Sequence, residues 1–192
     1  MQTRDRPVLG FASAADWEAW LAENGAVSAG LWLKIGKRGA SEPSVTYDEA
    51  LDVALCHGWI DGQKDTFDEA HWLQRFTPRR PGSKWSRRNR DKATELIARG
   101  RMQSAGLREV EAARADGRWD AAYASSSTAE VPDDLQLALD ANPAACDFFA
   151  TLDRANRYAI LYRIQDAKRP ETRARRIATF VAMLAEGKKL HP

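Results

Sequence analysis

Hydrophobic residues in the N-terminal part of the chain follow strand spacing and helix spacing in turn. Residues 30–36 (GLWLKIG) place an apolar side chain at every second position, which predicts a strand. Segments 59–67 and 70–76 are short and close together, and they indicate a hairpin or two short strands. Apolar residues three or four positions apart predict helices over 14–24, 46–58, 87–99 and 105–116. The first twelve residues show neither spacing, and we expect a loose arm there.

Capping residues mark the beginnings of several predicted helices. Thr46 and Glu49 have the T-x-x-E spacing of a capping box, and Ser13 and Ser86 suit the N-cap position. Ahead of Ser86, the Pro/Gly-rich segment TPRRPGSKW (77–85) has no periodicity, and we expect it to form an exposed loop. The predicted strands therefore all lie before this loop.

The hydrophobic pattern changes after residue 123. SSSTAE (125–130), followed by Pro132, has the small polar composition of a linker. The chain beyond it has helical spacing, and Pro143 behind Asn142 suits a first helical turn. We therefore expect an α+β fold in three parts. They are a domain over 1–123 with a small antiparallel sheet packed with helices, a linker over 124–131, and an all-helical bundle over 132–192.

The composition is that of an ordinary globular protein of 192 residues, with 44% hydrophobic and 29% charged residues. No apolar run approaches the roughly 18 residues of a transmembrane helix. The N-terminus lacks the apolar core of a signal peptide. Cys56 and Cys146 are too few for a disulfide framework. We therefore expect a cytoplasmic protein without a membrane span.

The net charge of +2 conceals four blocks of alternating sign. Residues 1–74 hold 6 Lys/Arg and 12 Asp/Glu, and residues 75–123 hold 13 and 6. Residues 124–153 hold none and 6, and residues 154–192 hold 10 and 3. Such blocks can pair within the molecule, or the two basic ones can face an acidic partner. A nucleic-acid-binding protein typically has a larger excess of positive charge.

The segment with the most features of a binding site is WLQRFTPRRPGSKWSRRNRDK (72–92). It contains eight Lys/Arg and one acid, with three aromatic residues between them. Guanidinium groups bind phosphate or carboxylate in a bidentate manner, and indole rings stack on planar groups. The Gly82-Ser83 turn ahead of the next predicted helix would also direct N–H groups at an anion. The alternative is a solvated basic face that pairs with the acidic first block.

A second candidate site follows the predicted helix that ends at Gly58. Trp59, Asp61 and Lys64 lie on extended chain, where polar groups can be directed into a cleft. Asp61 could orient a substrate amine or act as a base, and Lys64 could hold an anion. Equally, Asp61 and Gly62 form a turn dipeptide, which would only shape the chain.

The sequence shows neither a nucleophile–base pair nor a metal motif. Cys56 and His57 are adjacent, and adjacent residues of a helix do not face each other, so we expect Cys56 to be a small core residue. The histidines and acids of residues 57–71 lack a metal-ligand spacing. The P-loop, dinucleotide-binding and G-x-S-x-G motifs are absent. We therefore predict no metal and no cofactor, and we assign no catalytic residue.

The last predicted helix carries Arg169, Arg173 and Arg176 on one face. Such a stripe can bind phosphates or an acidic protein surface. It can equally pair with the acidic segment 130–153, which precedes it. Both alternatives stay open at the level of sequence.

Five segments occur in an order that resembles the YdeI/OmpD-associated family. They are GLWLKIGKR, TYDEALDVALCHGWIDGQ, QRFTPRRPGSKWSRRN, GRMQSAGLREVEAARADGRWDAAY and AKRPETRARRI. The resemblance runs from about Trp17 to Lys188. It implies a bacterial protein whose C-terminal part is an OmpD-associated or bacteriocin-protection region, with a link to the cell envelope or to stress. It brings no established set of catalytic residues.

These features together predict a cytoplasmic, non-enzymatic binding protein linked to stress or bacteriocin tolerance. Its partner would be an anionic small molecule or an acidic protein surface, with nucleic acid less favoured. The predicted ligand-binding residues are Trp59, Asp61, Lys64, Arg79, Arg80, Ser83, Lys84, Trp85 and Asn89. One alternative is an enzyme for a small anionic substrate, with Asp61 as base and Arg79 or Arg80 as anchor. The other is a nucleic-acid-binding protein that uses 75–92 and the C-terminal arginine stripe. The sequence indicates no oligomeric state.

Overall fold

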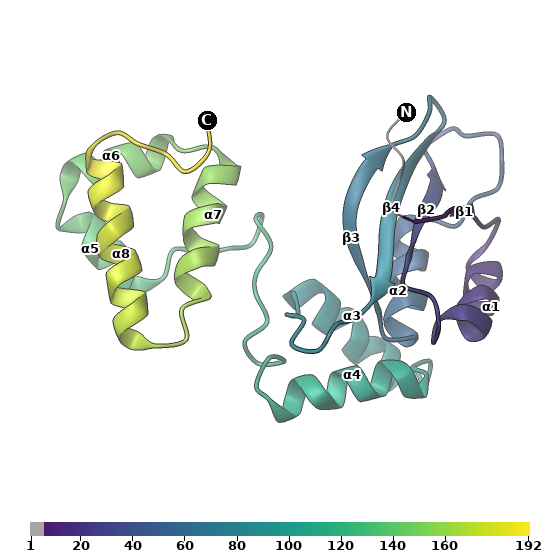
Figure 1. Cartoon of the computed structure of the whole chain (residues 1–192). Coiled ribbons are helices and arrows are strands. Elements are labelled where there is room, and N and C mark those ends of the chain that lie inside the picture. Colours follow the sequence, from purple (N-terminus) through teal and green to yellow (C-terminus); the bar gives the residue numbers. More distant parts are fainter. Residues whose placement is uncertain (1–5) are drawn as a thin grey trace. The chain divides into compact units, whose positions relative to one another are not determined.

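The computed structural model describes residues 6–192 and divides into two compact units. The first unit ends at Ala122, and the second runs over Tyr123–Pro192 (Figure 1). Each unit has a hydrophobic core of its own. The α+β class expected from the sequence is confirmed, because a four-stranded sheet precedes the purely helical part. Within the described residues, no helix combines the length and the apolar character needed to cross a membrane.

The first unit contains the sheet and the first helices of the chain. Its elements are β1 (Val8–Gly10), α1 (Ala14–Asn24), β2 (Leu31–Gly36), α2 (Tyr47–Cys56), β3 (Trp59–Thr66), β4 (His71–Pro78), α3 (Arg87–Ala98) and α4 (Ser104–Ala115). Ser13, Thr46 and Ser86 each accept a backbone N–H at the start of a helix, as predicted. The capping box of Thr46 with Glu49 is complete.

The sheet has the strand order β1-β2-β4-β3 and is mixed. β1 runs parallel to β2, and β4 is antiparallel to both β2 and β3. The predictions of a purely antiparallel sheet and of a loose arm are therefore wrong for residues 8–10, while residues 1–5 lie outside the described part of the chain. Three residues are too few to show an alternation, and this strand depends on its pairing with Trp32 and the next residues of β2.

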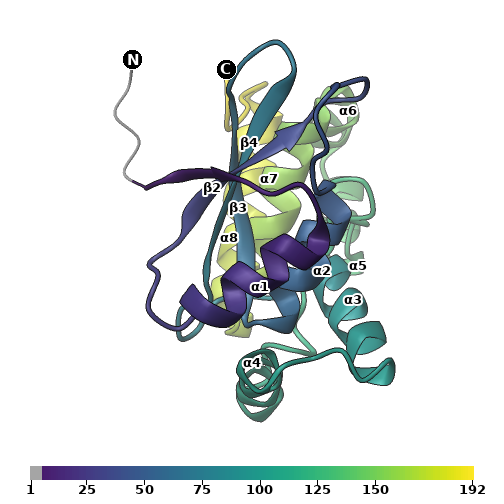
Figure 2. The ribbon, with the colours of Figure 1, turned by 90° about the vertical axis from the view of Figure 1, so that its right-hand side faces the viewer.

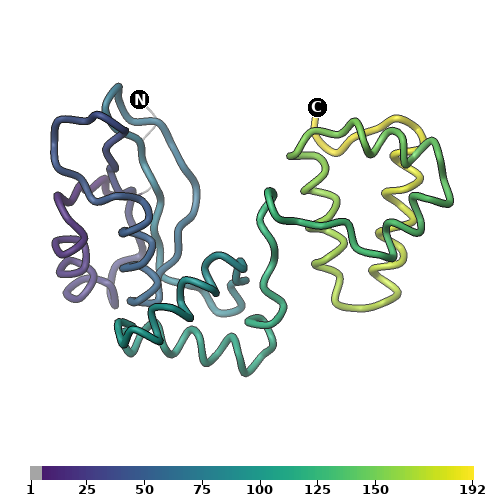
Figure 3. Tube along the Cα trace, turned by 180° about the vertical axis from the view of Figure 1, so that it is seen from behind, coloured from purple at the N-terminus to yellow at the C-terminus, as the bar shows by residue number. Residues whose placement is uncertain are grey.

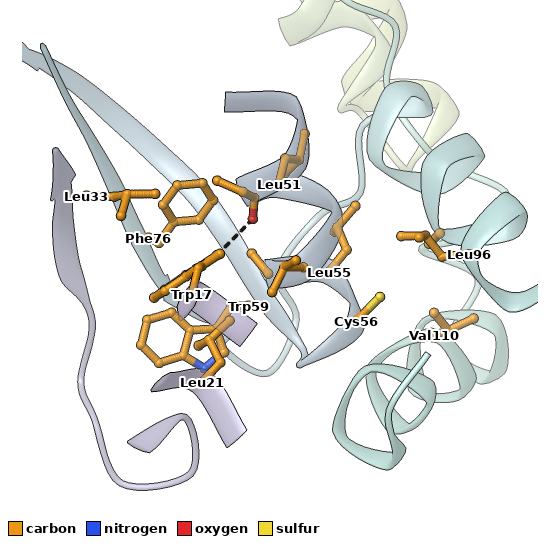
Figure 4. Packing of buried hydrophobic residues seen from close by; sticks show 14 of the residues in the cluster. Trp17, Leu21, Leu33, Leu51, Leu55, Cys56, Trp59, Phe76, Leu96 and Val110 are labelled. Carbon is orange, nitrogen blue, oxygen red and sulfur yellow. Dashed lines mark hydrogen bonds between the residues drawn. The ribbon is translucent and has the colours of Figure 1, made fainter. Parts of the chain in front are cut away.

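Helices α1 and α2 cover one face of the sheet (Figures 1 and 2). Leu33 and Phe76 are fully buried on this face. Trp17 of α1 lies over them, with its ring 5.8 Å from that of Phe76. The Trp17 indole N–H donates to the Ala50 carbonyl oxygen of α2 at 3.1 Å (Figure 4). The buried donor is satisfied in this way, so the indole can occupy the centre of the core.

The opposite face of the sheet, which we call the open face, is left uncovered by α1 and α2. Side chains directly opposite each other in an antiparallel pair project to the same side. The pairs that share the open face are Trp32 with Arg75, Lys34 with Leu73, and Ile60 with Thr77. Lys34, Arg75 and Trp32 therefore lie on the open face, where Trp32 is buried and the two basic residues are half-buried.

A β-bulge interrupts β3 between Asp61 and Lys64. Gln74 of β4 is fully buried and donates from its amide to the carbonyl oxygens of Gly62 at 2.8 Å and Gln63 at 3.2 Å. The extra residue shifts the alternation of side chains along β3. Asp61 and Lys64 consequently both project toward the face that the helices cover.

Helices α3 and α4 pack against α2. Figure 4 shows Leu96 of α3 and Val110 of α4 on the side of α2 that carries Leu55 and Cys56. The helices approach most closely at Gly106, where a Cβ would lie 2.4 Å from the Cys56 carbonyl oxygen. This contact holds α4, which follows β4 and α3 in the chain, against the C-terminal end of α2.

The second unit is a small helical bundle (Figure 3). Its helices are α5 (Asp133–Asp140), α6 (Pro143–Thr151), α7 (Arg154–Gln165) and α8 (Pro170–Ala185). Leu135, Ile160 and Leu184 are fully buried in its core. Asn142 caps α6 and is followed by Pro143 in the first turn, as predicted.

Candidate functional site

The basic loop, residues 79–85, joins β4 to α3 and is held by two buried or half-buried arginines. The Arg79 guanidinium lies 3.5 Å from the centre of the Trp85 ring and donates to the Lys84 carbonyl oxygen. The Arg118 guanidinium donates to the Ser83 carbonyl oxygen at 2.7 Å. These contacts hold the end of the loop, with the carbonyl groups of Ser83 and Lys84 turned toward the protein.

This arrangement corrects the prediction that segment 77–85 forms an exposed loop. Arg79 is 6% exposed and Trp85 is 1% exposed, whereas Arg80, Gly82 and Lys84 lie at the surface. The physical reason is the stacking of Arg79 on Trp85, which lets a charged group share the burial of the indole. Only part of the loop can therefore contact a ligand.

The two tryptophans predicted to bind a ligand both belong to the hydrophobic core. Trp59 is 1% exposed, and its indole N–H donates to the Gly25 carbonyl oxygen at 3.1 Å. Its ring makes edge contacts with Trp17 and Trp20. Trp85 makes a similar contact with Trp119. Both side chains are therefore buried in the core and are not available to a ligand.

An open cavity of about 420 Å³ lies on the open face, beside the basic loop. Its lining residues are Ile60, Gly62, Gln63, Arg75, Thr77, Pro78, Arg80, Pro81, Gly82 and Ser83. They include two arginines and no carboxylate. Arg80 is exposed and makes no side-chain hydrogen bond or ion pair within the described residues. The cavity is thus suited to an anion.

Asp61 lies on the other face of the sheet, away from this cavity. Its carboxylate accepts hydrogen bonds from the Tyr47 hydroxyl at 2.8 Å and from the Asn89 amide at 3.3 Å. Asn89 itself is 6% exposed. The hydrogen bonds among these three side chains connect α2, β3 and α3, so they also stabilise the packing of these elements.

Lys64 projects toward the same side as Asp61 and lies over two aromatic rings. Its ammonium nitrogen is 5.4 Å from the centre of the Tyr47 ring and 4.9 Å from that of Trp72. The Arg88 guanidinium contacts the Tyr47 ring as well, at 5.0 Å. The structure therefore does not bring the predicted residues together in one site. Asp61, Lys64 and Asn89 lie on the helix-covered side, and Arg80 and Ser83 line the cavity on the open face.

Burial and the carboxylate of Asp61 raise the pKa of Tyr47 well above its ordinary value. The phenol therefore stays protonated and continues to donate to Asp61. Arg88 opposes this shift, since a nearby cation favours the phenolate.

Charges of the second block pair with those of the first block inside this unit. Arg88 contacts Asp48 at 2.7 Å, and Lys92 contacts Asp52 at the same distance. Arg101 lies 3.8 Å from Glu18. These pairs follow the intramolecular alternative that the charge blocks left open, and they account for basic residues of α3 but not for Arg80.

Cys56 behaves as a core residue, as expected from the sequence. It is fully buried, and burial raises the pKa of its thiol to about 11. Burial also lowers the pKa of His57. Since the thiolate is the reactive form, neither shift favours nucleophilic chemistry. No group of three or more potential metal ligands occurs among residues 6–192.

Two residues that shape these surfaces are not among those predicted from the sequence. Arg75 lines the cavity, and its position could have been read from the alternation of β4, which places it on the same side as Thr77. Tyr47 lies in the first turn of α2, directly after the N-cap Thr46. No local signal connects it to Asp61, because their contact spans 14 residues and requires the strand to pack on the helix.

Comparison with known families divides the chain in two. Residues 9–109 match the family model described as Domain of unknown function (DUF8412). Residues 128–187 match the model described as Bacteriocin-protection, YdeI or OmpD-Associated. The resemblance drawn from the sequence is confirmed for the C-terminal region, and the sheet and basic loop fall under the first model. No curated protein and no solved structure matches the chain.

Proposed function

We propose that this chain, which belongs to the DUF8412 family through residues 9–109 and carries a YdeI/OmpD-associated domain over 128–187, is a binding protein for a small anionic ligand. The ligand would occupy the cavity on the open face of the sheet. The observation that carries the proposal is the lining of that cavity, which combines Arg75 and Arg80 with no acidic side chain.

The contacts that hold the end of the basic loop support this proposal. Arg79 and Arg118 hold the carbonyl groups of Lys84 and Ser83 from the protein side. The loop can therefore present Arg80 and the Gly82-Ser83 backbone to a ligand without first becoming ordered. Preorganisation of this kind reduces the entropic cost of binding.

The rival enzyme hypothesis receives less support. It requires Asp61 beside an anchoring arginine of the cavity, but the Asp61 carboxylate accepts hydrogen bonds from Tyr47 and Asn89 on the opposite face. A general base must come within hydrogen-bond reach of the proton that it abstracts. A ligand in the cavity would be separated from Asp61 by the sheet itself.

The proposal keeps the cytoplasmic location and the link to stress or bacteriocin tolerance that the sequence suggested. The unpaired state of Cys56 and Cys146 supports a reducing compartment. The description of the C-terminal family model supports the link to bacteriocin protection. An acidic protein surface is the second candidate partner, because its carboxylates carry the same negative charge as a small anionic ligand.

The first test is a titration of the full chain with pyrophosphate and with citrate at low salt, followed by tryptophan fluorescence and melting temperature. Trp32 is the cross-strand partner of Arg75 on the open face, so its emission should respond to binding. We expect saturable binding of at least one of the two anions. Arg80→Ala should weaken it by about tenfold or more, because it removes a charge-assisted contact.

Arg99→Ala is the matched control, since Arg99 is an exposed arginine at the C-cap of α3 whose ion pair is with Glu95 of that helix. It should leave the affinity unchanged. If neither anion alters the emission or the melting temperature, the proposal is wrong.

A gel shift with a single-stranded oligonucleotide at two salt concentrations tests the nucleic-acid alternative. Oligonucleotide binding that falls steeply with salt, in a protein that binds neither pyrophosphate nor citrate, would favour the nucleic-acid alternative instead.

A further inference from the structure

A second, smaller cavity lies away from the basic loop and shares none of its lining residues. Its volume is about 240 Å³, which suits a ligand of a few heavy atoms. The residues that line it are Gly10, Phe11, Ala12, Lys34, Glu42, Pro43, Ser44 and His71. Three of them are ionisable, and they come from β2, β4 and the segment between β2 and α2. Residues distant in sequence thus converge on one small polar space.

His71 is the most buried of these ionisable residues, at 8% exposure. Its Nδ1 lies 3.0 Å and 3.1 Å from the two carboxylate oxygens of Asp68. Asp68 is fixed in turn by the backbone N–H groups of Ala70 and His71, which donate to its Oδ1. The carboxylate therefore orients the ring and leaves Nε2 for contacts in the cavity. A second proton on Nε2 makes the ring a cation that donates toward a carboxylate.

Glu42 places one carboxylate oxygen between the two basic groups of this cavity. Its Oε2 lies 3.8 Å from the Lys34 ammonium nitrogen and 3.9 Å from His71 Nε2. Both distances exceed that of a hydrogen bond. The Glu42 side chain is 70% exposed and belongs to neither a helix nor a strand. The carboxylate is thus close enough to neutralise the two bases but is held loosely.

We propose that Lys34 and His71 form a binding site for a small carboxylate, and that Glu42 occupies this site as an internal competitor until a ligand displaces it. Lys34 supplies a fixed charge, and His71, oriented by Asp68, supplies a directed donor. The site differs from the cavity at Arg80 in its residues, and it stands whether or not that cavity binds an anion.

Four charged groups lie around His71. They are Asp68 from the β3–β4 turn, Glu42 from the β2–α2 segment, Lys34 from β2, and Lys37, whose ammonium group donates to the Asp68 carbonyl oxygen. The Glu42 carboxylate lies within 4 Å of both Lys34 and His71, so it is the group that the carboxylate of a ligand would replace.

The test is an NMR titration of the full chain with acetate, with the ring resonances of His71 as the readout. The chain has only three histidines, so these resonances can be assigned by substitution. We expect acetate to shift His71 saturably in the wild-type protein. Glu42→Gln removes the competing charge, and it should tighten acetate binding by roughly fivefold, the scale of one partly exposed ion pair.

Lys34→Met keeps the aliphatic stem that packs near Gly10 while removing the charge, and it should abolish the acetate-dependent shift. In the double variant, Glu42→Gln should bring no gain, because the competitor acts through Lys34. Two controls accompany these variants. Glu95→Gln changes an exposed carboxylate on α3 and should have no effect, and acetamide, the neutral counterpart of acetate, should not shift His71.

Three results would overturn the proposal. The first is that Glu42→Gln weakens acetate binding or has only the effect of Glu95→Gln. The second is that acetamide shifts His71 as strongly as acetate does. The third is that acetate shifts His71 in neither the wild-type protein nor Glu42→Gln, although fluorescence and melting temperature show that both proteins are folded.

Discussion

The phenol of Tyr47 lies between the Asp61 carboxylate and the Arg88 guanidinium. Because of this position, the first unit should lose stability at alkaline pH. The phenol hydroxyl donates to Asp61 at 2.8 Å, and the pKa of Tyr47 is raised by burial and by that carboxylate. In the unfolded chain the phenol ionises near pH 10. The unfolded state therefore loses its proton first, and the stability linked to Tyr47 is present below about pH 10 and falls above it.

Tyr47→Phe should flatten this dependence. We expect the variant to lose about 1 kcal/mol at neutral pH with the hydrogen bond, and to fall less steeply than the wild type between about pH 9 and pH 11. Urea unfolding followed by tryptophan fluorescence measures this, because all seven tryptophans lie before residue 123. Tyr162→Phe, in the second unit, is the control and should keep the wild-type slope. An equally steep decline in Tyr47→Phe would contradict the assignment.

At the scale of elements, sequence identified what depends on local chemistry and missed what depends on distant partners. The capping box at Thr46 and the caps at Ser13 and Ser86 are short-range interactions, and all three helices begin where the sequence predicted. Strand β1 has three residues and no periodicity of its own, and it exists through its pairing with β2. The bulge that turns Lys64 to the side of Asp61 depends on the buried amide of Gln74, which no local pattern reveals.

The crossing of α2 and α4 is the contact between elements that is most sensitive to a single methyl group. A Cβ at Gly106 would lie 2.4 Å from the Cys56 carbonyl oxygen and 2.6 Å from that of Leu55. Backbone atoms cannot yield as a flexible side chain does, so α4 must move away from α2. Gly106→Ala should therefore destabilise the first unit by about 2 kcal/mol, despite the better helix propensity of alanine.

Gly117→Ala separates this steric effect from the ordinary cost of replacing a glycine. Gly117 has a φ of +78°, but a Cβ there would meet no atom within 4 Å. Its replacement should cost about 1 kcal/mol through backbone strain alone. Urea unfolding of both variants decides the matter, and a smaller loss for Gly106→Ala than for Gly117→Ala would show that the helices do not pack as closely as described.

At the scale of the whole molecule, the four charge blocks correspond to the two units. Residues 1–123 hold 19 Lys/Arg and 18 Asp/Glu, and residues 124–192 hold 10 and 9, so each part is close to neutral. Arg88 pairs with Asp48 in the first unit, and Arg173 pairs with Asp134 in the second. Arg173 and Arg176 also donate to carbonyl oxygens at the end of α7, so two members of the predicted arginine stripe serve the bundle itself. These pairings weaken the case for a nucleic-acid surface.

Sequence predicted that a basic segment would matter but not which of its side chains would be available. Arg79 and Arg80 are neighbours of the same type, yet Arg79 is stacked on Trp85 and Arg80 is exposed at the cavity. The difference arises because the Arg79 guanidinium stacks on the buried Trp85 ring at the end of the loop, whereas the Arg80 side chain lines the cavity. Composition describes a segment as basic, whereas the path of the chain decides which charge reaches a ligand.

Two separate hydrophobic cores should give two separable unfolding transitions. Leu135 is fully buried in the second core, and Leu135→Ala should destabilise that unit by about 2–4 kcal/mol. Leu137 lies on the same helix at 71% exposure, so Leu137→Ala should change stability by less than about 0.5 kcal/mol. Far-UV circular dichroism detects both units, while tryptophan emission reports on the first alone. We expect Leu135→Ala to lower only the transition that tryptophan does not follow, and an equal shift of both signals would mean that the units unfold as one.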